Sequence, residues 1–209
     1  MNYLNESSIE NLEHLYKINL INSCSGYKSS NLIGTKSNAG IENVAVFSSV
    51  THIGSSPAML GFFMRPTTVI RNTYDNIKSN GFYTINHIHK SIIEDAHHTS
   101  AKYDASVSEF GVTNLNSEYK NNFYAPFVNN APVQLAMQFV EEYDIKANNT
   151  ILVIGKIIGL HIKDNLLQDD GFIDLAKAEV ATINGLDGYA IPKSNTRFGY
   201  QRPKLQMHK

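Results

Sequence analysis

The amino-acid sequence predicts a mainly β protein, a β-barrel with a few peripheral helices. Apolar and polar residues alternate over residues 133–143, which is the period of a half-buried strand. A β-branched run over residues 150–162 follows a turn at Asn148-Asn149, so the two segments form a long antiparallel hairpin. Several shorter strand-like segments precede this hairpin, and only a few helix-like segments lie between them.

Composition and charge restrict the class of protein. Of the 209 residues, 42% are apolar and 18% are charged, which provides a core and argues against disorder. The formal net charge is −1, so no basic field attracts nucleic acid or an anionic membrane. No apolar run approaches the roughly 20 residues of a membrane span. We therefore expect a cytoplasmic protein that binds neither nucleic acid nor membrane.

The N-terminal segment is acidic and predicts a helix over residues 7–20, because Ser7 and Glu10 have the spacing of a capping box. Its acidic residues and its lack of an apolar region exclude a signal peptide. Cys24 is the single cysteine, which excludes an intrachain disulfide and a multi-cysteine metal site. We expect a single structural domain overall, made of a helical extension, residues 1–29, and a barrel domain, residues 30–209.

The first half of the barrel domain alternates between strands and helices. Strands are predicted over residues 30–37 and 44–51, with a hairpin loop between them. The apolar run 58–64 lies between Pro57 and Pro66 and predicts a buried strand. A helix is predicted to open at Pro66-Thr67-Thr68 and to end at Asn80-Gly81, where a glycine supplies a left-handed cap.

The remaining elements follow in the same way. Residues 82–88 predict a strand, and Ser91 with Glu94 predicts a capping box that opens a helix over 91–103. Residues 104–130 predict an irregular, loop-rich segment. In the final hairpin, Gly155 and Gly159 indicate bulges or sharp bends, and Asp169-Asp170-Gly171 is a further turn.

The residues that carry chemistry lie between positions 43 and 87. Two guanidinium groups, two hydroxyls and the free amides of a predicted helix start come together at Arg65, Thr67, Thr68 and Arg71, which is a pattern suited to phosphate. Hydroxyls at residues 48, 49 and 51 interrupt a strand and could satisfy the edge of a planar heterocycle. The alternative interpretation is a helix cap with surface arginines and a strand with a polar outer face.

Other motifs point elsewhere or are missing. The sequence contains no G-x-G-x-x-G fingerprint and no G-x-S-x-G elbow. The histidines at 87, 89, 97 and 98 lie near Glu94 and Asp95, and they could form a zinc or iron site or simply a polar strand end facing an exposed helix. Their spacing matches no known ligand pattern, so we expect no metal.

The ordered set of motifs resembles the flavin reductase-like family of FMN-binding split barrels, related to the small NAD(P)H:FMN oxidoreductases. The resemblance covers about residues 30–203, and it rests on Asn43, Ser48-Ser49, Ser56-Pro57, the run 58–64, Thr67-Thr68, Asn76-Ile77, Gly81-Phe82 with Asn86, Ala131-Pro132, Gly155, Asp170-Gly171 and Arg197-Phe198-Gly199-Tyr200. The chain departs from the family pattern at Pro57-Ala58, where the family often has two prolines. It departs again at Arg65-Pro66-Thr67-Thr68, which leaves the phosphate ligands open.

The resemblance implies an FMN-binding split β-barrel with FMN laid along the strand that ends at His52. The isoalloxazine and ribityl would meet Asn43, Phe47, Ser48 and Ser49, with backbone groups of Val50 and Thr51 at the polar edge of the ring. The phosphate would be held by Arg65, Thr67, Thr68 and Arg71. Asn86 and His87 would complete the pocket, with His87 as a polar wall rather than a proton donor, and no residue is assigned a catalytic role.

The resemblance also implies a function, an FMN-dependent oxidoreductase that takes hydride from NAD(P)H and passes electrons to free flavin, ferric iron or a partner oxygenase. Two alternatives stay open: a flavin-binding electron carrier without its own NAD(P)H activity, and a metalloprotein or interaction domain that uses the histidines. A homodimer is expected because related barrels commonly share the flavin cleft. Arg197 and Arg202 in the C-terminal tail could hold a nucleotide phosphate or simply pack on the surface.

Overall fold

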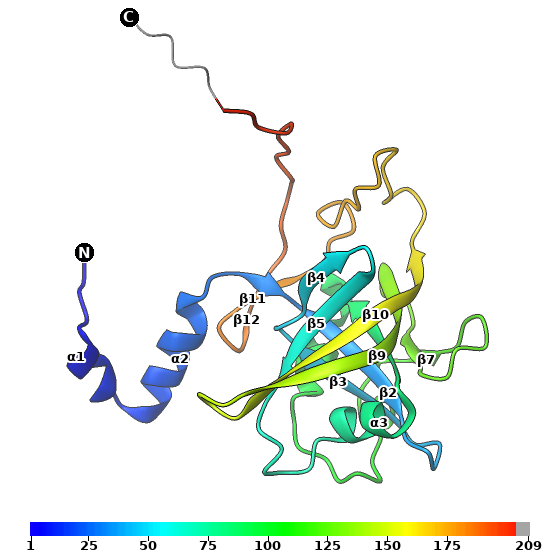
Figure 1. The fold of residues 1–209 in the computed structure, drawn as a ribbon, viewed down its shortest axis with the longest axis horizontal. Helices are drawn as coiled ribbons and strands as arrows, with labels where there is room; N and C mark the ends of the chain where they lie inside the picture. The colour runs from blue at the N-terminus through cyan, green and yellow to red at the C-terminus, as the bar shows by residue number, and fades with distance from the viewer. Residues whose placement is uncertain (204–209) are drawn as a thin grey trace, which may run out of the picture.

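A seven-stranded antiparallel sheet forms the centre of the molecule (Figure 1), and the computed structural model describes residues 1–203. Its strands are β2 (Asn31–Lys36), β3 (Glu42–Phe47), β4 (Thr51–Ser55), β5 (Ala58–Met64), β6 (Phe82–His87), β9 (Val133–Ile145) and β10 (Thr150–Ile162). Their order across the sheet is β3-β2-β6-β9-β10-β5-β4. The mainly β architecture predicted from the sequence is confirmed.

The sheet is strongly curved, because its two edge strands are consecutive in the chain. Only residues 48–50 separate the end of β3 from the start of β4. Those peptide units span at most about 14 Å. In a flat sheet the same edges would be six strand spacings apart, or roughly 29 Å. The sheet therefore curls into a barrel that stays split between β3 and β4, since neither is paired with the other.

The barrel interior is filled by alternate residues of the strands, as the period of two requires. A T-shaped aromatic chain runs through it, with ring centroids 5.1 Å apart for Phe47 and Phe62 and 5.8 Å apart for Phe62 and Tyr83. The other buried members of this cluster are Ile33, Met64, Ile77, Ile85, Val133, Leu135, Met137, Ile151 and Val153.

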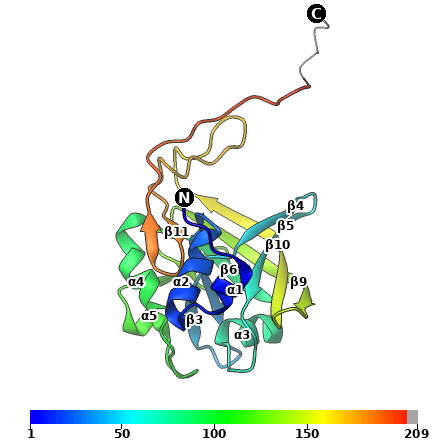
Figure 2. The same cartoon turned by 90° about the vertical axis from the view of Figure 1, so that its left-hand side faces the viewer.

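Helices and short strands cover the outside of the barrel and its ends (Figure 2). A second apolar cluster, which includes Leu32, Val44 and Ala96, lies between the outer face of β2–β3 and the region of α4 and α5. The elements outside the seven-stranded sheet are α1 (Glu6–Glu10) and α2 (His14–Cys24), which project beside the barrel, and α3 (Asn72–Asn80), the 3₁₀ turn η1 (Lys90–Ile92), α4 (Ile93–His98), α5 (Glu109–Val112), β1 (Lys28–Ser29), β7 (Ser117–Glu118), β8 (Phe127–Val128), β11 (Thr182–Asn184) and β12 (Gly188–Ala190).

Most of the strand predictions are confirmed. The strands predicted over 58–64 and 150–162 have these bounds in the structure, and the strand predicted over 82–88 ends one residue earlier. Both predicted bulges exist, since the β9–β10 register shifts at Gly155 and again between Ile157 and Gly159. Gly81 has φ +79° and caps α3 in the left-handed region. Among residues 1–203, no helix has the length and apolar character needed to cross a membrane.

The helix boundaries were predicted less well. The helix expected over 7–20 is two helices, because Asn5 caps α1 and Glu13 begins a new cap by accepting from the Tyr16 amide at 3.0 Å. The helix expected from Ser91 to residue 103 ends at His98.

Two further corrections bear on the site. The helix expected to open at Pro66 begins only at Asn72, so residues 65–71 form a loop before it. The strand expected over 44–51 ends at Phe47, because the chain must leave β3 to cross to the other edge of the sheet.

Gly155 marks the tightest packing in the barrel. A Cβ at this position would lie 2.0 Å from the Tyr83 hydroxyl, which is buried and has no hydrogen-bond partner within residues 1–203. The Tyr83 side chain thus occupies the space that the Cβ atom of any residue other than glycine at position 155 would need.

We expect Gly155→Ala to lower the free energy of unfolding by about 1–3 kcal/mol, because overpacking forces the strands or the ring to shift. Combining it with Tyr83→Phe should restore part of that loss by removing the hydroxyl. Urea denaturation measures both effects, with Gly111→Ala as control, since a Cβ at Gly111 meets nothing within 4 Å. Equal stability of Gly155→Ala and the wild type would contradict this packing argument.

Candidate functional site

The candidate site begins where the chain crosses from β3 to β4. Ser49 stands beside the end of β5, where its hydroxyl donates to the Phe63 carbonyl at 3.1 Å and accepts from the Phe63 amide at 3.0 Å. The Ser29 hydroxyl donates to the Val50 carbonyl at 3.0 Å on the other side. These bonds hold residues 48–50 in place of a regular strand pairing.

The same hydrogen bonds bring the crossing segment next to the proposed phosphate loop. Phe63 is two residues before Arg65, so residues 48–51 and the start of the loop 65–71 lie at one end of β5, and the loop then leads to α3. The side chains of Arg65, Thr67 and Thr68 are exposed. Arg71 is the N-cap of α3 and carries a buried Nε atom with no hydrogen-bond partner in the described chain.

The unpaired Nε atom of Arg71 shows whether the residues of this loop suit the phosphate group of FMN. A buried guanidinium nitrogen without an acceptor is costly, and a phosphate oxygen is the acceptor that such a group binds best. Exposed hydroxyls and a second guanidinium precede it in the same loop. The residues present therefore fit a phosphate group. Of the predicted phosphate ligands, only Arg71 lies at the start of α3, whereas Thr67 and Thr68 lie in the loop before it.

A second part of the predicted site lies at the end of the barrel interior. Phe47 and His87 are the cross-strand partners of Asn31, one on each side of it. Alternation along β2, β3 and β6 turns all three toward the interior. Burial lowers the pKa of His87 to about 4. The ring is therefore neutral at physiological pH.

Two residues predicted to contact FMN, Asn43 and Asn86, instead form hydrogen bonds within the protein. Asn43 is buried, and its amide donates to the hydroxyls of Thr35 and Thr73, which ties β3 to α3. Asn86 is also buried, with its amide donating to the Leu32 carbonyl and its oxygen accepting from the Val128 amide. The amide nitrogen of Asn43 and both the nitrogen and the oxygen of the Asn86 amide are thus hydrogen-bonded within the protein.

The remaining predicted residues lie on β4 and before it. Thr51 opens β4 opposite Gly61 and is exposed. His52 is exposed and pairs its Nε2 with the Ser55 hydroxyl at 3.1 Å. Thus the structure gathers residues 47–51 and the start of the loop 65–71 at the split of the barrel, and places Arg71 at the start of α3 and His52 farther along the β4–β5 hairpin.

The prediction missed Ser29 and Phe63, which position the crossing segment. Ser29 contacts Val50 only because β1 lies beside the split, and Phe63 contributes through its backbone. A backbone contact leaves no signal in residue type, and neither contact is local in sequence.

The four clustered histidines do not converge. His89 pairs with the Ser91 hydroxyl, His97 lies 3.3 Å from the Tyr189 hydroxyl and His98 lies 2.6 Å from the Tyr103 hydroxyl. Across residues 1–203, no group of three histidine, cysteine or acidic side chains is arranged to hold a metal ion.

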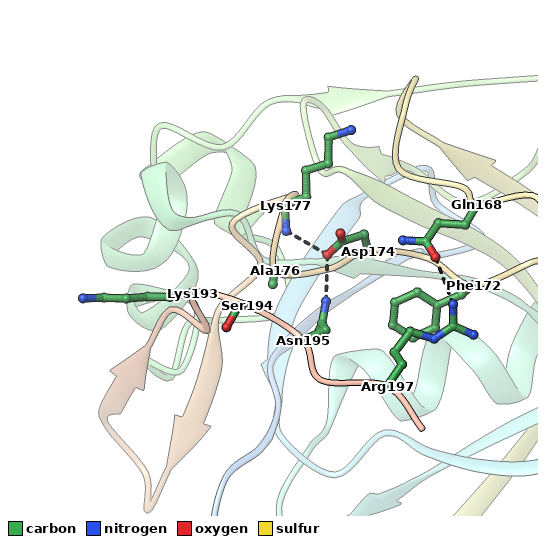
Figure 3. A pocket seen from close by; sticks show the side chains of 9 residues that line it. All are labelled: Gln168, Phe172, Asp174, Ala176, Lys177, Lys193, Ser194, Asn195 and Arg197. Carbon is green, nitrogen blue, oxygen red and sulfur yellow. Dashed lines mark hydrogen bonds between the residues drawn. The ribbon is translucent and has the colours of Figure 1, made fainter. Parts of the chain in front are cut away.

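The C-terminal tail lies against the loop after β10 (Figure 3). Arg197 donates to Asp170 at 2.6 Å and to Gln168 at 2.9 Å, with its guanidinium 4.1 Å from the centre of the Phe172 ring. Asn195 donates to Asp174 at 2.7 Å. A cavity of about 370 Å³ lies between tail and loop. Arg197 is thus bonded to its own chain in this structure.

Comparison with solved structures supports the split barrel. A split-barrel protein of Shewanella frigidimarina, thought to be a flavin reductase, is 41% identical, and the alignment covers 96% of this chain and 100% of that one with a TM-score of 0.93. Nitrilotriacetate monooxygenase component B of Bacillus cereus shares the fold at 16% identity, with 96% and 98% covered and a TM-score of 0.79. The FMN-binding protein of Thermus thermophilus does so at 12% identity, with 85% and 93% covered and a TM-score of 0.71.

The family model of the flavin reductase like domain matches residues 27–176. This match includes the whole seven-stranded sheet, the crossing segment and the loop that carries Arg65 and Arg71. The resemblance and the split-barrel fold predicted from the sequence are both confirmed, and the chain belongs to the flavin reductase-like domain family.

Proposed function

We propose that this protein is an FMN-binding oxidoreductase that accepts hydride from NADH or NADPH. The observation that carries the proposal is the contact of residues 48–51 with the end of β5, where the loop 65–71 begins, held by the two hydrogen bonds between Ser49 and Phe63. Family membership and the FMN-binding relative from Thermus support the choice of flavin. When bound, FMN supplies a ring that takes up a hydride and passes on electrons.

The protein's own residues bind and orient the cofactor in this proposal. Arg71 and Arg65 neutralise the phosphate, with Thr67 and Thr68 as hydroxyl donors. Peptide groups and hydroxyls of residues 48–51 meet the ring and ribityl, because this crossing segment has no neighbouring strand on one side. His87 contributes a neutral polar wall, since a ring with a pKa of about 4 carries no proton to donate near pH 7.

Electron acceptors and partners follow from the same proposal. Free flavin, ferric iron and a partner oxygenase are each compatible with a flavin bound at an open edge. The structural likeness to a monooxygenase component supports an oxygenase as one acceptor. We also propose a homodimer, supported by outward apolar residues on the barrel wall next to the site.

The deciding experiment is an absorbance titration with FMN followed by NADH and, separately, NADPH. We expect flavin bands to shift on binding and then to bleach when the nicotinamide is added. Binding without bleaching would favour the alternative, a flavin-binding electron carrier. If FMN does not bind, the proposal is wrong.

Replacing Arg71 tests the phosphate contact directly. We expect Arg71→Ala to weaken FMN binding at least tenfold, because a charge-assisted hydrogen bond to phosphate is lost. Binding of riboflavin, which has no phosphate, should change little. Fluorescence titration of both ligands measures the ratio, with Lys102→Ala, an exposed site on the α4–α5 connection, as control. An equal loss for both ligands would contradict the assignment.

The pKa of His87 predicts a pH dependence of stability. Its folded value of about 4 lies below the ordinary 6.5, so the unfolded chain binds the proton first as pH falls. We therefore expect the free energy of unfolding to fall between pH 6.5 and 4, and less so in His87→Gln. Chemical denaturation across this range provides the measurement, with His14→Gln on the first turn of α2 as control. Parallel curves for His87→Gln and wild type would refute the assignment.

A further inference from the structure

The N-terminal arm, residues 1–27, stands off the barrel. No residue of α1 or α2 is buried. Leu15, Tyr16 and Ile21 on α2 keep 64%, 57% and 47% of their surfaces exposed. Figures 1 and 2 show both helices projecting beside β11 and β12 rather than packing across the barrel wall.

Nothing in residues 1–203 covers the apolar side chains of this arm. An isolated helix of eleven residues is marginal in water, and most helices are stabilised by packing of an apolar face. The apolar residues of α2 are distributed around more than one side of the helix, which is the pattern of a helix covered on several faces.

The base of the arm is pinned, so the helices are held away from their own barrel wall. The Lys28 ammonium donates to the carbonyls of Asn22 and Gly185, each at 3.1 Å. The first of these belongs to α2 and the second to the turn between β11 and β12. This bridge holds the end of α2 beside β11–β12, whereas β5, β10 and β9 form a different side of the barrel (Figure 2).

That side carries an uncovered apolar row made of Phe63, Leu152 and Tyr143. These residues are successive cross-strand partners on β5, β10 and β9. They point outward, because the neighbouring residues of β5 and β10 fill the barrel core. Phe63 is 44% exposed and Tyr143 is 51% exposed, and Ile53 extends the row over Gly61.

We propose that the N-terminal arm of one subunit covers the apolar row of a second copy, and that the second copy returns the same contact. Each chain carries one arm and one row, so two copies satisfy each other through a two-fold axis and leave neither element open. An unrelated partner would cover only one of the two. The five residues of α1, the eleven of α2 and the strands of the row approach the 20–30 residues a side of a stable interface.

The arrangement deepens the proposed function, on whose homodimer it rests. Phe63 belongs to the row through its side chain and to the site through its backbone bonds with Ser49. An arm laid on the row therefore meets the strand that holds the crossing segment. Dimerisation would then restrict the motion of β5 and of the crossing segment bound to it.

Crosslinking of mixed subunits tests the exchange, using the single native cysteine. Cys24 is exposed at the end of α2. One chain keeps Cys24, and its co-expressed partner carries Cys24→Ser with Glu141→Cys, an exposed position on β9 beside the row. We expect a short bis-maleimide to join the two chains. Ala105→Cys, exposed between α4 and α5 on another wall, serves as the matched control and should not crosslink.

Light scattering of the full chain accompanies this test, with an arm variant as second measurement. We expect Leu15→Glu with Ile21→Glu to weaken dimerisation at least tenfold, whereas Asn19→Glu, an exposed polar site on the same helix, should leave it unchanged. A monomeric wild type would overturn the proposal, and so would a dimer that crosslinks equally at positions 141 and 105. FMN titration of each sample distinguishes a failure of the proposed flavin binding from a failure of the arm exchange. Flavin binding without arm exchange refutes only the exchange.

Discussion

The closure of the sheet depends on three residues. Residues 48–50 must connect strands that lie at opposite edges of a seven-stranded sheet, so the sheet has to curl until the edges are neighbours. The interior that results is narrow, and it is filled by the rings of Phe47, Phe62 and Tyr83. Because Gly155 has no side chain, it leaves room for the hydroxyl of Tyr83. The curvature, the aromatic core and this glycine are consequences of one short connection.

The same connection creates the place where a ligand can bind. A residue in the middle of a sheet has its peptide groups paired on both sides, but a segment that crosses between edges does not. Here the Ser49 side chain substitutes for part of the missing pairing through Phe63, and Ser29 does so at Val50. Peptide groups and hydroxyls therefore remain near the surface on a rigid support, next to a loop with two arginines.

The N-terminal arm and the apolar row both expose apolar side chains in the single chain. Helices without buried residues and a strand row with half-exposed aromatic side chains carry a cost in water that packing would remove. The tail has a different character, because Arg197 and Asn195 anchor it to its own chain by polar bonds. Residues 1–27 thus expose apolar side chains, whereas Asn195 and Arg197 are held to their own chain by polar bonds.

The sequence by itself determined most of the strands of the sheet, several turns and the family. Alternation over residues 133–143, the proline boundaries of 58–64 and the glycine at 81 are local signals, and local signals decide such elements. Only the tertiary structure decided which polar side chains lack a hydrogen-bond partner within the protein. Asn43 and Asn86 have the residue type of ligand contacts, yet each is hydrogen-bonded to partners far away in sequence. Arg71 keeps an unpaired buried nitrogen, and Ser49 reaches Phe63 because the sheet closes. Hydrogen-bond satisfaction depends on neighbours brought together by folding, and that is why residue type and spacing could not reveal it.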